Sequence, residues 1–235
     1  IWLMDNYIEI KNITKTYNKT LALDDLTLSL SKGKVYGLLG PNGSGKTTLL
    51  KILASLTNPN KGEIRILDKK LDYSNKKSTV FLADKQFLYD ELTTLDNVNI
   101  FNDFYEDFDL EYANKLIEYF NLGLNDRPCD LSKGDYKKLA ISLVLSRDAD
   151  LYLLDEPTNE LDPISFAKTL DLLIEKFDGE KTFIIATHQI EMLENLFDEV
   201  IFLDQGSLHH MDDAKNIRNK NMSDIYNFYD EIYLG

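Results

Sequence analysis

The sequence contains a single cysteine and no long apolar run. Cys129 cannot form an internal disulfide, so we expect the chain to work in a reducing compartment such as the cytosol. No apolar run approaches the roughly 18 residues that span a bilayer, and the N-terminus lacks the basic and then apolar pattern of a secretory signal. We therefore expect no direct insertion of this chain into a membrane.

An excess of positive charge is also missing. The 235 residues include 26 basic and 40 acidic side chains, a net charge of −14, and the basic runs are no longer than pairs such as Lys69-Lys70. Nucleic acid binding needs a positive footprint that neutralises phosphates, so no nucleic acid partner is expected. The hydrophobic content of 43% is enough for a sizeable core in one large domain.

The most informative stretch is a glycine-rich segment, Gly40 to Thr47, between the apolar run Val35–Leu39 and leucines at helical spacing. A strand, turn and helix start of this kind direct backbone N–H groups and a helix dipole at one anion. Lys46 is suited to neutralise the β- and γ-phosphates, and the Thr47 hydroxyl to bind Mg²⁺. The segment predicts nucleoside triphosphate binding. The predicted contacts are Gly40, Asn42, Gly43, Ser44, Gly45, Lys46, Thr47 and Thr48.

Two carboxylates follow a second apolar run. Leu151–Leu154 is typical of a buried parallel strand, and Asp155 and Glu156 come directly after it. Ligands of open α/β sheets bind beyond the carboxyl ends of the strands. Asp155 is therefore the predicted Mg²⁺ ligand, and Glu156 the predicted general base that orients the attacking water.

His188 follows a third apolar run, Phe183–Ala186. A lone histidine is more often structural, but this one would face the same sheet edge as the glycine-rich segment and the two carboxylates. We predict that it donates a hydrogen bond to the γ-phosphate. With Lys46 and Glu156 it forms the predicted catalytic set.

A further helix is predicted to begin at Ser132. Apolar residues recur on one of its faces, and Lys137 and Lys138 lie on another. Ser132 is suited to cap the helix, with Asp135 completing a capping box. Alternatively, the Ser132 hydroxyl and the Gly134 N–H form a second anion site. The spacing alone favours the cap.

The order of these segments indicates an α/β fold. Strand patterns fill the first third, a helical stretch follows from about residue 95 to 147, strands then return, and the tail from Met211 onward predicts one or two amphipathic helices. This order predicts a helical lobe inserted between a β-rich front and a parallel-sheet back. The predicted strands are Tyr7–Lys11, Leu26–Leu30, Val35–Leu39, Glu63–Asp68, Thr79–Leu82, Asp150–Leu154, Thr182–Ala186 and Val200–Leu203.

From about residue 7 to 208 the chain resembles the nucleotide-binding subunits of ATP-binding cassette (ABC) transporters. The resemblance rests on five motifs in the order typical of that family: Gly40–Thr47, Leu131–Asp135, Asp155-Glu156, Asn159–Asp162 and His188. It implies a single α/β domain over residues 1–235. Its parts would be a P-loop NTPase core of mixed β-sheet and helices (about 4–94 and 148–208) with an N-terminal antiparallel β subdomain, an inserted helical subdomain (about 95–147) and a C-terminal helical tail (about 209–235).

The resemblance also implies roles for individual residues. In this family the segment with Ser132 and Gly134 is the signature sequence, which completes the ATP site of the opposite subunit, so two chains would hold two ATP molecules between them. Asp162 resembles the residue of the loop that connects the two sites. Tyr17 resembles the aromatic residue that stacks on adenine, with a core aromatic as the alternative. ATP and Mg²⁺ are the implied cofactors.

Two places depart from the family pattern. In the signature sequence Lys133 replaces a glycine and Asp135 a glutamine, so a negative charge faces a phosphate site and Lys133 is available to offset it. A lysine at this position is similar to that of a bacterial export-type subgroup. The family's glutamine that senses Mg²⁺ falls on Asp84, which we prefer as a metal contact over Gln86, with a plain surface loop as the alternative to both.

The resemblance therefore predicts an ATPase subunit that powers export through a separate integral membrane permease, which would dock near Phe87, Leu88 and Tyr89. A second ATPase subunit is expected, in a homodimer rather than a heterodimer, at the cytoplasmic face of the cell membrane. One alternative is a soluble ATPase of this family acting on DNA or ribosomes, which the single uninterrupted cassette disfavours. Another is a non-hydrolytic ATP clamp, which the intact Lys46 and Glu156 disfavour.

Overall fold

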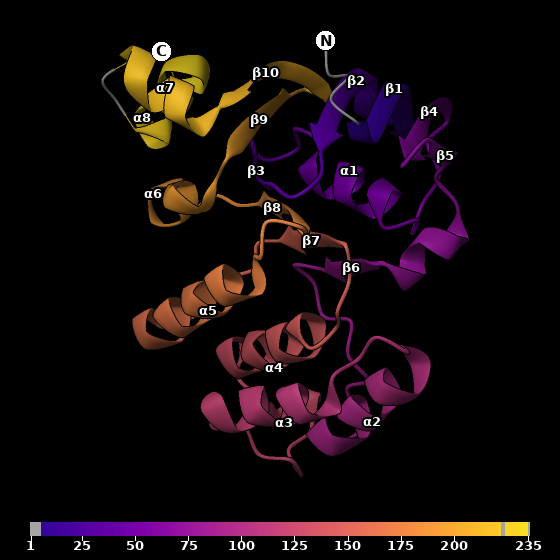
Figure 1. Cartoon of the computed structure of the whole chain (residues 1–235), viewed down its shortest axis with the longest axis vertical. Helices are drawn as coiled ribbons and strands as arrows, with labels where there is room; N and C mark the ends of the chain where they lie inside the picture. The colour runs from indigo at the N-terminus through magenta and orange to yellow at the C-terminus, as the bar shows by residue number, and fades with distance from the viewer. Residues whose placement is uncertain (1–5, 222–223, 235) are drawn as a thin grey trace.

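Six strands form the central sheet of the computed structural model, which describes residues 6–221 and 224–234 (Figure 1). Their order is β10-β9-β3-β8-β7-β6; the five strands from β9 to β6 run parallel, and β10 is antiparallel to β9. The strands are β3 (Val35–Leu39), β6 (Thr79–Leu82), β7 (Leu151–Asp155), β8 (Thr182–Ala186), β9 (Glu199–Asp204) and β10 (Ser207–Asp213).

A second, antiparallel sheet comes from the N-terminal third, in the order β2-β1-β4-β5. Its strands are β1 (Asn6–Tyr17), β2 (Thr20–Ser31), β4 (Lys61–Ile66) and β5 (Lys69–Lys70). The first two are longer than predicted, because they continue through register shifts between Ile10 and Ile13 and between Ile13 and Lys15. Asn12 and Asp25 have φ angles of 51° and 50° there, so the alternation of apolar side chains breaks while the strands continue.

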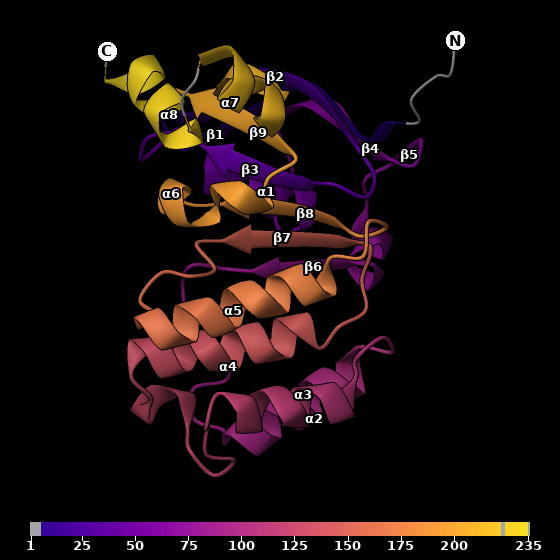
Figure 2. The ribbon, with the colours of Figure 1, turned by 60° about the vertical axis from the view of Figure 1, so that its left-hand side comes forward.

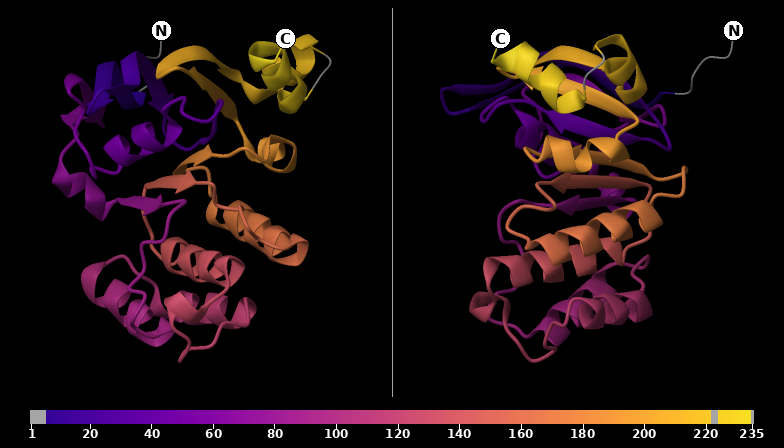
Figure 3. Two further views of the ribbon diagram at one scale, coloured as in Figure 1. Left: turned by 180° about the vertical axis from the view of Figure 1, so that it is seen from behind. Right: turned by 90° about the vertical axis from the view of Figure 1, so that its left-hand side faces the viewer.

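The helices cover both faces of the central sheet. The first, α1, lies between the two sheets, whereas α4 and α5 run side by side on the other face (Figure 2). Helices α2 and α3 pack beyond α4, and α7 and α8 lie beside β9 and β10 (Figure 3). The helices are α1 (Lys46–Leu53), α2 (Thr94–Phe104), α3 (Leu110–Tyr119), α4 (Lys133–Leu145), α5 (Pro163–Lys176), α6 (Ile190–Leu193), α7 (Ala214–Asn221) and α8 (Ile225–Tyr233).

Two apolar cores lie on the two faces of the central sheet. In β3, Val35 and Leu39 belong to the core under α4 and α5, whereas Tyr36 and Leu38 belong to the core around α1. Burial on both faces explains why the parallel strands are continuous apolar runs rather than alternating ones. Because β3, β7 and β8 run parallel, their carboxyl ends lie at the same edge of the central sheet, and the packing on both faces holds them there.

The predicted α/β fold is confirmed, and the predicted bounds of β3, β6 and β8 match the structure. The prediction of helix from Met211 is wrong for its first residues, because Met211 pairs with Ile201 and β10 continues to Asp213. The division into core, helical subdomain and tail stays a prediction, and residues 4–5, 222–223 and 235 of those ranges lie outside the described residues. Within the described ranges, no helix is long and apolar enough to cross a membrane.

Replacing Leu153 by alanine should destabilise the whole domain. Leu153 is fully buried at the centre of β7, so Leu153→Ala leaves a cavity that we expect to cost about 2–5 kcal/mol of unfolding free energy. The same truncation at Leu124, which is 42% exposed, should cost about 1 kcal/mol or less. Urea denaturation of both variants measures the difference, and equal losses would contradict the placement of the core.

Candidate functional site

A cavity of about 520 Å³ lies at the carboxyl edge of the central sheet. Its walls come from the loop between β3 and α1, the first turn of α1, the ends of β7 and β8, and the start of β2. Its size is typical of a small-molecule site. The lining residues are Thr20, Leu21, Ala22, Asn42, Gly43, Ser44, Gly45, Lys46, Thr47, Thr48, Asp84, Asp155, Glu156, Asn159, His188 and Gln189.

The loop after β3 has the geometry of an anion site. Gly40 has a φ angle of 150°, and a Cβ there would lie 2.2 Å from the Leu203 carbonyl oxygen, so the close approach requires glycine. The buried Lys46 ammonium donates to the carbonyl oxygens of Gly40 and Pro41 at 2.6 and 3.1 Å. The Ser44 hydroxyl is buried without a hydrogen-bond partner in the described structure. An unpaired hydroxyl and a buried ammonium at a helix N-terminus fit phosphate oxygens.

Thr47 and Asp155 join the first turn of α1 to the end of β7. The Thr47 hydroxyl donates to the Asp155 carboxylate at 2.8 Å. Burial raises the pKa of Asp155 above its ordinary value, and the Thr47 hydrogen bond opposes that shift. In the described part of the chain, no three His, Cys, Asp or Glu side chains are placed to hold a metal ion by themselves. One hydroxyl and one carboxylate instead suit Mg²⁺ that arrives with phosphate and water ligands.

Glu156 and His188 lie next to each other beyond β7 and β8. The His188 backbone N–H donates to the Glu156 carboxylate at 3.2 Å, and the His188 Nε2 is 3.5 Å from its other oxygen. Burial raises the pKa of Glu156 to about 7, with a smaller upward contribution from Asp155. Burial, followed by the nearby Lys46 charge, lowers the pKa of His188. A carboxylate with a pKa near neutrality is suited to accept a proton from water.

Of the two candidates for a metal contact before α2, Asp84 lines the cavity and Gln86 does not. Lys137 of α4 reaches toward the same place, since its ammonium is 4.0 Å from the Asp84 carboxylate and donates to the Glu156 carbonyl oxygen at 3.2 Å. Lys137 was predicted to lie on a face of α4 away from the apolar one, yet only 5% of the residue is exposed. Helical spacing cannot show that the polar face meets a site instead of solvent.

Five predicted contacts do not line this cavity, and one of them is Gly40 of the loop described above. Tyr17 is 42% exposed, has the Lys15 ammonium 4.9 Å from its ring centre, and pairs in register with Thr20, which does line the cavity. Ser132 caps α4 by accepting from the Asp135 N–H, so the predicted cap is confirmed, but the Asp135 carboxylate accepts from the Ser132 hydroxyl and does not complete the predicted capping box. The other two are Gly134 in the first turn of α4 and Asp162.

The Asp162 carboxylate caps α5. It accepts from the backbone N–H groups of Ile164 and Ser165 and from the Ser165 hydroxyl. The Ser165 hydroxyl hydrogen bond, with the backbone hydrogen bonds, lowers the pKa of Asp162 to about 2. Several lining residues were not predicted, among them Thr20, Leu21 and Gln189, because they belong to no recognisable motif. Asn159 was recognised only as the first residue of the Asn159–Asp162 motif, without a contact of its own.

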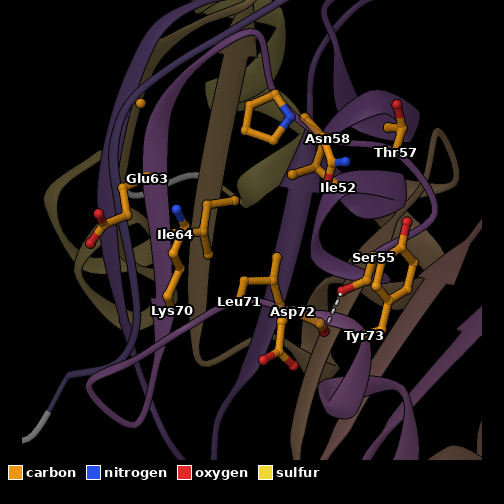
Figure 4. A pocket seen from close by; sticks show the side chains of 12 residues that line it. Ile52, Ser55, Thr57, Asn58, Glu63, Ile64, Lys70, Leu71, Asp72 and Tyr73 are labelled. Atoms are coloured by element: carbon orange, nitrogen blue, oxygen red, sulfur yellow. Dashed lines mark hydrogen bonds between the residues drawn. The ribbon is translucent and has the colours of Figure 1, made fainter.

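A second cavity, of about 390 Å³, lies at the far end of α1 (Figure 4). Its walls include Ile52, Ile64, Leu71 and Tyr73. None of the predicted site residues lines it, and the Ser55 hydroxyl beside it donates to the Asp72 carbonyl oxygen. The chemistry described here therefore lies in the cavity that contains Lys46.

Together, the fold and the cavity with Lys46, Thr47 and Asp155 define a nucleoside triphosphate-hydrolysing domain. The family model for ABC transporters matches residues 23–159, more than half of the chain. This chain belongs to the ABC transporter family, as an ATP-binding subunit with an ATPase domain.

Individual relatives agree with this assignment. The chain is 28% identical over 214 residues to the ABC transporter ATP-binding protein YtrB of Bacillus subtilis, covering 90% of this chain and 73% of the relative. It is 31% identical to the L-cystine import ATP-binding protein TcyC of the same species, covering 85% and 87%. Among solved structures, the dimeric cassette MJ0796 in a post-hydrolysis state with ADP and Pi superposes with a TM-score of 0.78 at 27% identity, covering 88% of this chain and 98% of that one.

Replacing Thr47 by valine should remove most of the effect of Mg²⁺ on ATP binding. Valine keeps the shape of threonine but lacks the hydroxyl that lies 2.8 Å from Asp155. We expect the gain in ATP affinity on adding Mg²⁺ to fall by at least about tenfold in Thr47→Val, while binding in EDTA is retained. Calorimetry with and without Mg²⁺ measures this gain, with Thr57→Val in the second cavity as the control. An undiminished Mg²⁺ effect would contradict the site.

Proposed function

We propose that this subunit hydrolyses Mg²⁺-bound ATP to power transport by a separate membrane-spanning permease, at the cytoplasmic face of the cell membrane. The observation that carries the proposal is the Glu156 carboxylate, which lies beside the cavity next to the joined Thr47 and Asp155 side chains. This arrangement puts a base of suitable pKa beside the position of a triphosphate.

Each residue has a distinct task in this proposal. Lys46 and the backbone N–H groups of the loop bind the phosphates, and the Ser44 hydroxyl gives one more donor. Thr47 and Asp155 would hold Mg²⁺, which when bound neutralises charge on the β- and γ-phosphates. Glu156 orients water and accepts its proton. His188, held against Glu156 by its backbone N–H, donates to the γ-phosphate.

We also propose that two copies of the chain bind ATP between them. At the tip of α4 Ser132 is exposed and Gly134 is half-buried, and both lie outside their own chain's cavity, which leaves Ser132 available to a second subunit. The relative MJ0796 is described as a dimeric cassette, which supports this arrangement. The homodimer stays a prediction, as do adenine stacking on Tyr17 and the connecting role of Asp162.

The charge of Asp135 is offset, although by a different residue from the one expected. Lys138 donates to the Asp135 carboxylate at 2.8 Å, whereas Lys133 pairs with Glu160 at 2.9 Å. The Asp135 carboxylate also accepts from the Ser132 hydroxyl at 2.7 Å. The signature sequence can therefore face phosphate without an unpaired negative charge.

A groove of about 380 Å³ between the core and the helical region is the proposed docking site for the permease. It lies where the chain leaves β6 for α2. Its lining includes the aromatic residues Phe87, Phe101 and Tyr105, and the basic residues Lys51, Lys76 and Arg147 also line it. An apolar lining with nearby cations suits an amphipathic cytoplasmic helix that carries acidic side chains. Of the predicted docking residues, Phe87 and Tyr89 are exposed and Leu88 is buried.

The direction of transport stays a prediction. Lys133 in the signature sequence favours export, whereas the relative TcyC is named for L-cystine import. Transport assays of the chain assembled with its membrane-spanning partner would decide between export and import. The ATPase chemistry is the same for both directions.

A charged side chain in the groove should release the permease. Phe87→Asp places a carboxylate among apolar groups at the proposed contact, so we expect the fraction of chain that co-purifies with the permease from detergent-solubilised membranes to fall at least about tenfold. Ile174→Asp, an equally polar change at an exposed site on α5, is the control. Retention of Phe87→Asp at the parental level would contradict the docking site.

Glu156→Gln tests the proposed reaction. The amide keeps the size of the carboxylate but cannot accept the proton of water, so we expect ATP hydrolysis to fall by about 10²–10⁴-fold while ATP still binds. Nucleotide-bound dimers should then accumulate in light scattering. Hydrolysis at the parental rate would contradict the assignment of the general base.

A further inference from the structure

Lys137 is a buried ammonium that the reaction described above does not use. It lies one turn into α4, and only 5% of the residue is exposed. Lysine is almost never buried to this extent unless it is paired. Its ammonium donates to the Glu156 carbonyl oxygen at 3.2 Å and lies 4.0 Å from the Asp84 carboxylate. Both belong to residues that line the ATP cavity.

The backbone that Lys137 contacts has an unusual conformation. Glu156 has a φ angle of 50°, in the left-handed region that residues with a Cβ adopt at an energetic cost. Such a conformation persists only where the surroundings hold it. Here it turns the chain directly after β7, and the Glu156 side chain meets the cavity and the His188 N–H as a result.

Groups from several elements hold this turn. The Glu156 N–H donates to the carbonyl oxygen of Ala186 at the end of β8, and its carbonyl oxygen accepts from the Asn159 N–H in the following loop. Lys137 donates to the same carbonyl oxygen from α4. The turn is thus tied to the neighbouring strand, to its own loop and to a helix of the inserted region.

The charges around the cavity also indicate that Lys137 acts on this part of the site. Asp84, Asp155 and Glu156 line it together. The buried ammonium groups near them in the described structure are Lys46, which the proposed mechanism assigns to phosphate, and Lys137. Because Lys46 would face the nucleotide, Lys137 is left to counter the carboxylates from the protein side.

We propose that Lys137 is a positioning residue for Glu156: its ammonium fixes the left-handed turn and so aims the carboxylate at the attacking water. The inference rests on the proposed function, since it assumes that Glu156 is the base. It also links two parts of the chain, because Lys137 lies five residues after Ser132 on the same helix, about 7–8 Å along its axis. A contact made at the Ser132 tip is therefore rigidly connected to the backbone of Glu156.

The test is ATP hydrolysis by the full chain assembled with its permease, in Lys137→Met and Lys137→Arg. Methionine fills a similar volume without a donor, and we expect it to lower kcat by about 10²-fold, the loss typical of a small misplacement of a reacting group. The affinity for Mg·ATP should not change. Arginine keeps a charged donor and should restore most of the activity. Lys115→Met on the exposed surface of α3 is the matched control and should keep the parental rate.

A double-mutant cycle with Glu156→Gln separates positioning from a general structural role. If Lys137 acts through Glu156, Lys137→Met should cause no further loss of single-turnover hydrolysis in the Glu156→Gln background. Losses that multiply, or a Lys137→Met variant as active as the parent, would overturn the inference. A parental rate in Glu156→Gln alone would instead overturn the proposed base, so the two failures are distinguishable.

Discussion

The site depends on charge gathered at one edge of the parallel sheet. Buried ammonium groups of Lys46 and Lys137 lie among three side chains that carry carboxylates, namely Asp84, Asp155 and Glu156. Ionised groups are costly to remove from water unless they are paired. A triphosphate with Mg²⁺ suits this edge, because its phosphates carry negative charge for the ammonium groups and its metal ion carries positive charge for the carboxylates. The strands around it are apolar on both faces, which fixes the positions of these charges.

Helix α4 connects the parts of the molecule that the proposed cycle needs. Its tip carries Ser132, its second turn carries Lys137, and its body packs in the core under the central sheet. The first turns of this helix carry charged side chains, and their charges are balanced in the ion pairs Lys133–Glu160 and Lys138–Asp135. In the proposed dimer, the Ser132 tip would contact the partner's nucleotide, and Lys137 would connect the same helix to the proposed base.

The sequence allowed most of the fold and the centre of the site to be predicted. The glycine-rich loop and the apolar strands were recognisable because their physics is local: φ angles, helix starts and continuous burial. The burial of Lys137 beside the cavity was not, because whether a polar helix face meets solvent or a site depends on tertiary packing. The start of the tail helix was misplaced for a similar reason, since Met211 extends a strand through its pairing with β9.

The most direct test of the central claim is a crystal structure of the chain with Mg²⁺ and a non-hydrolysable ATP analogue. We predict phosphate oxygens at the Lys46 ammonium and the Ser44 hydroxyl, with the metal ion between Thr47 and Asp155. A nucleotide bound elsewhere, for example in the cavity beside Ile52 and Tyr73, or a metal ion away from Asp155, would contradict the account.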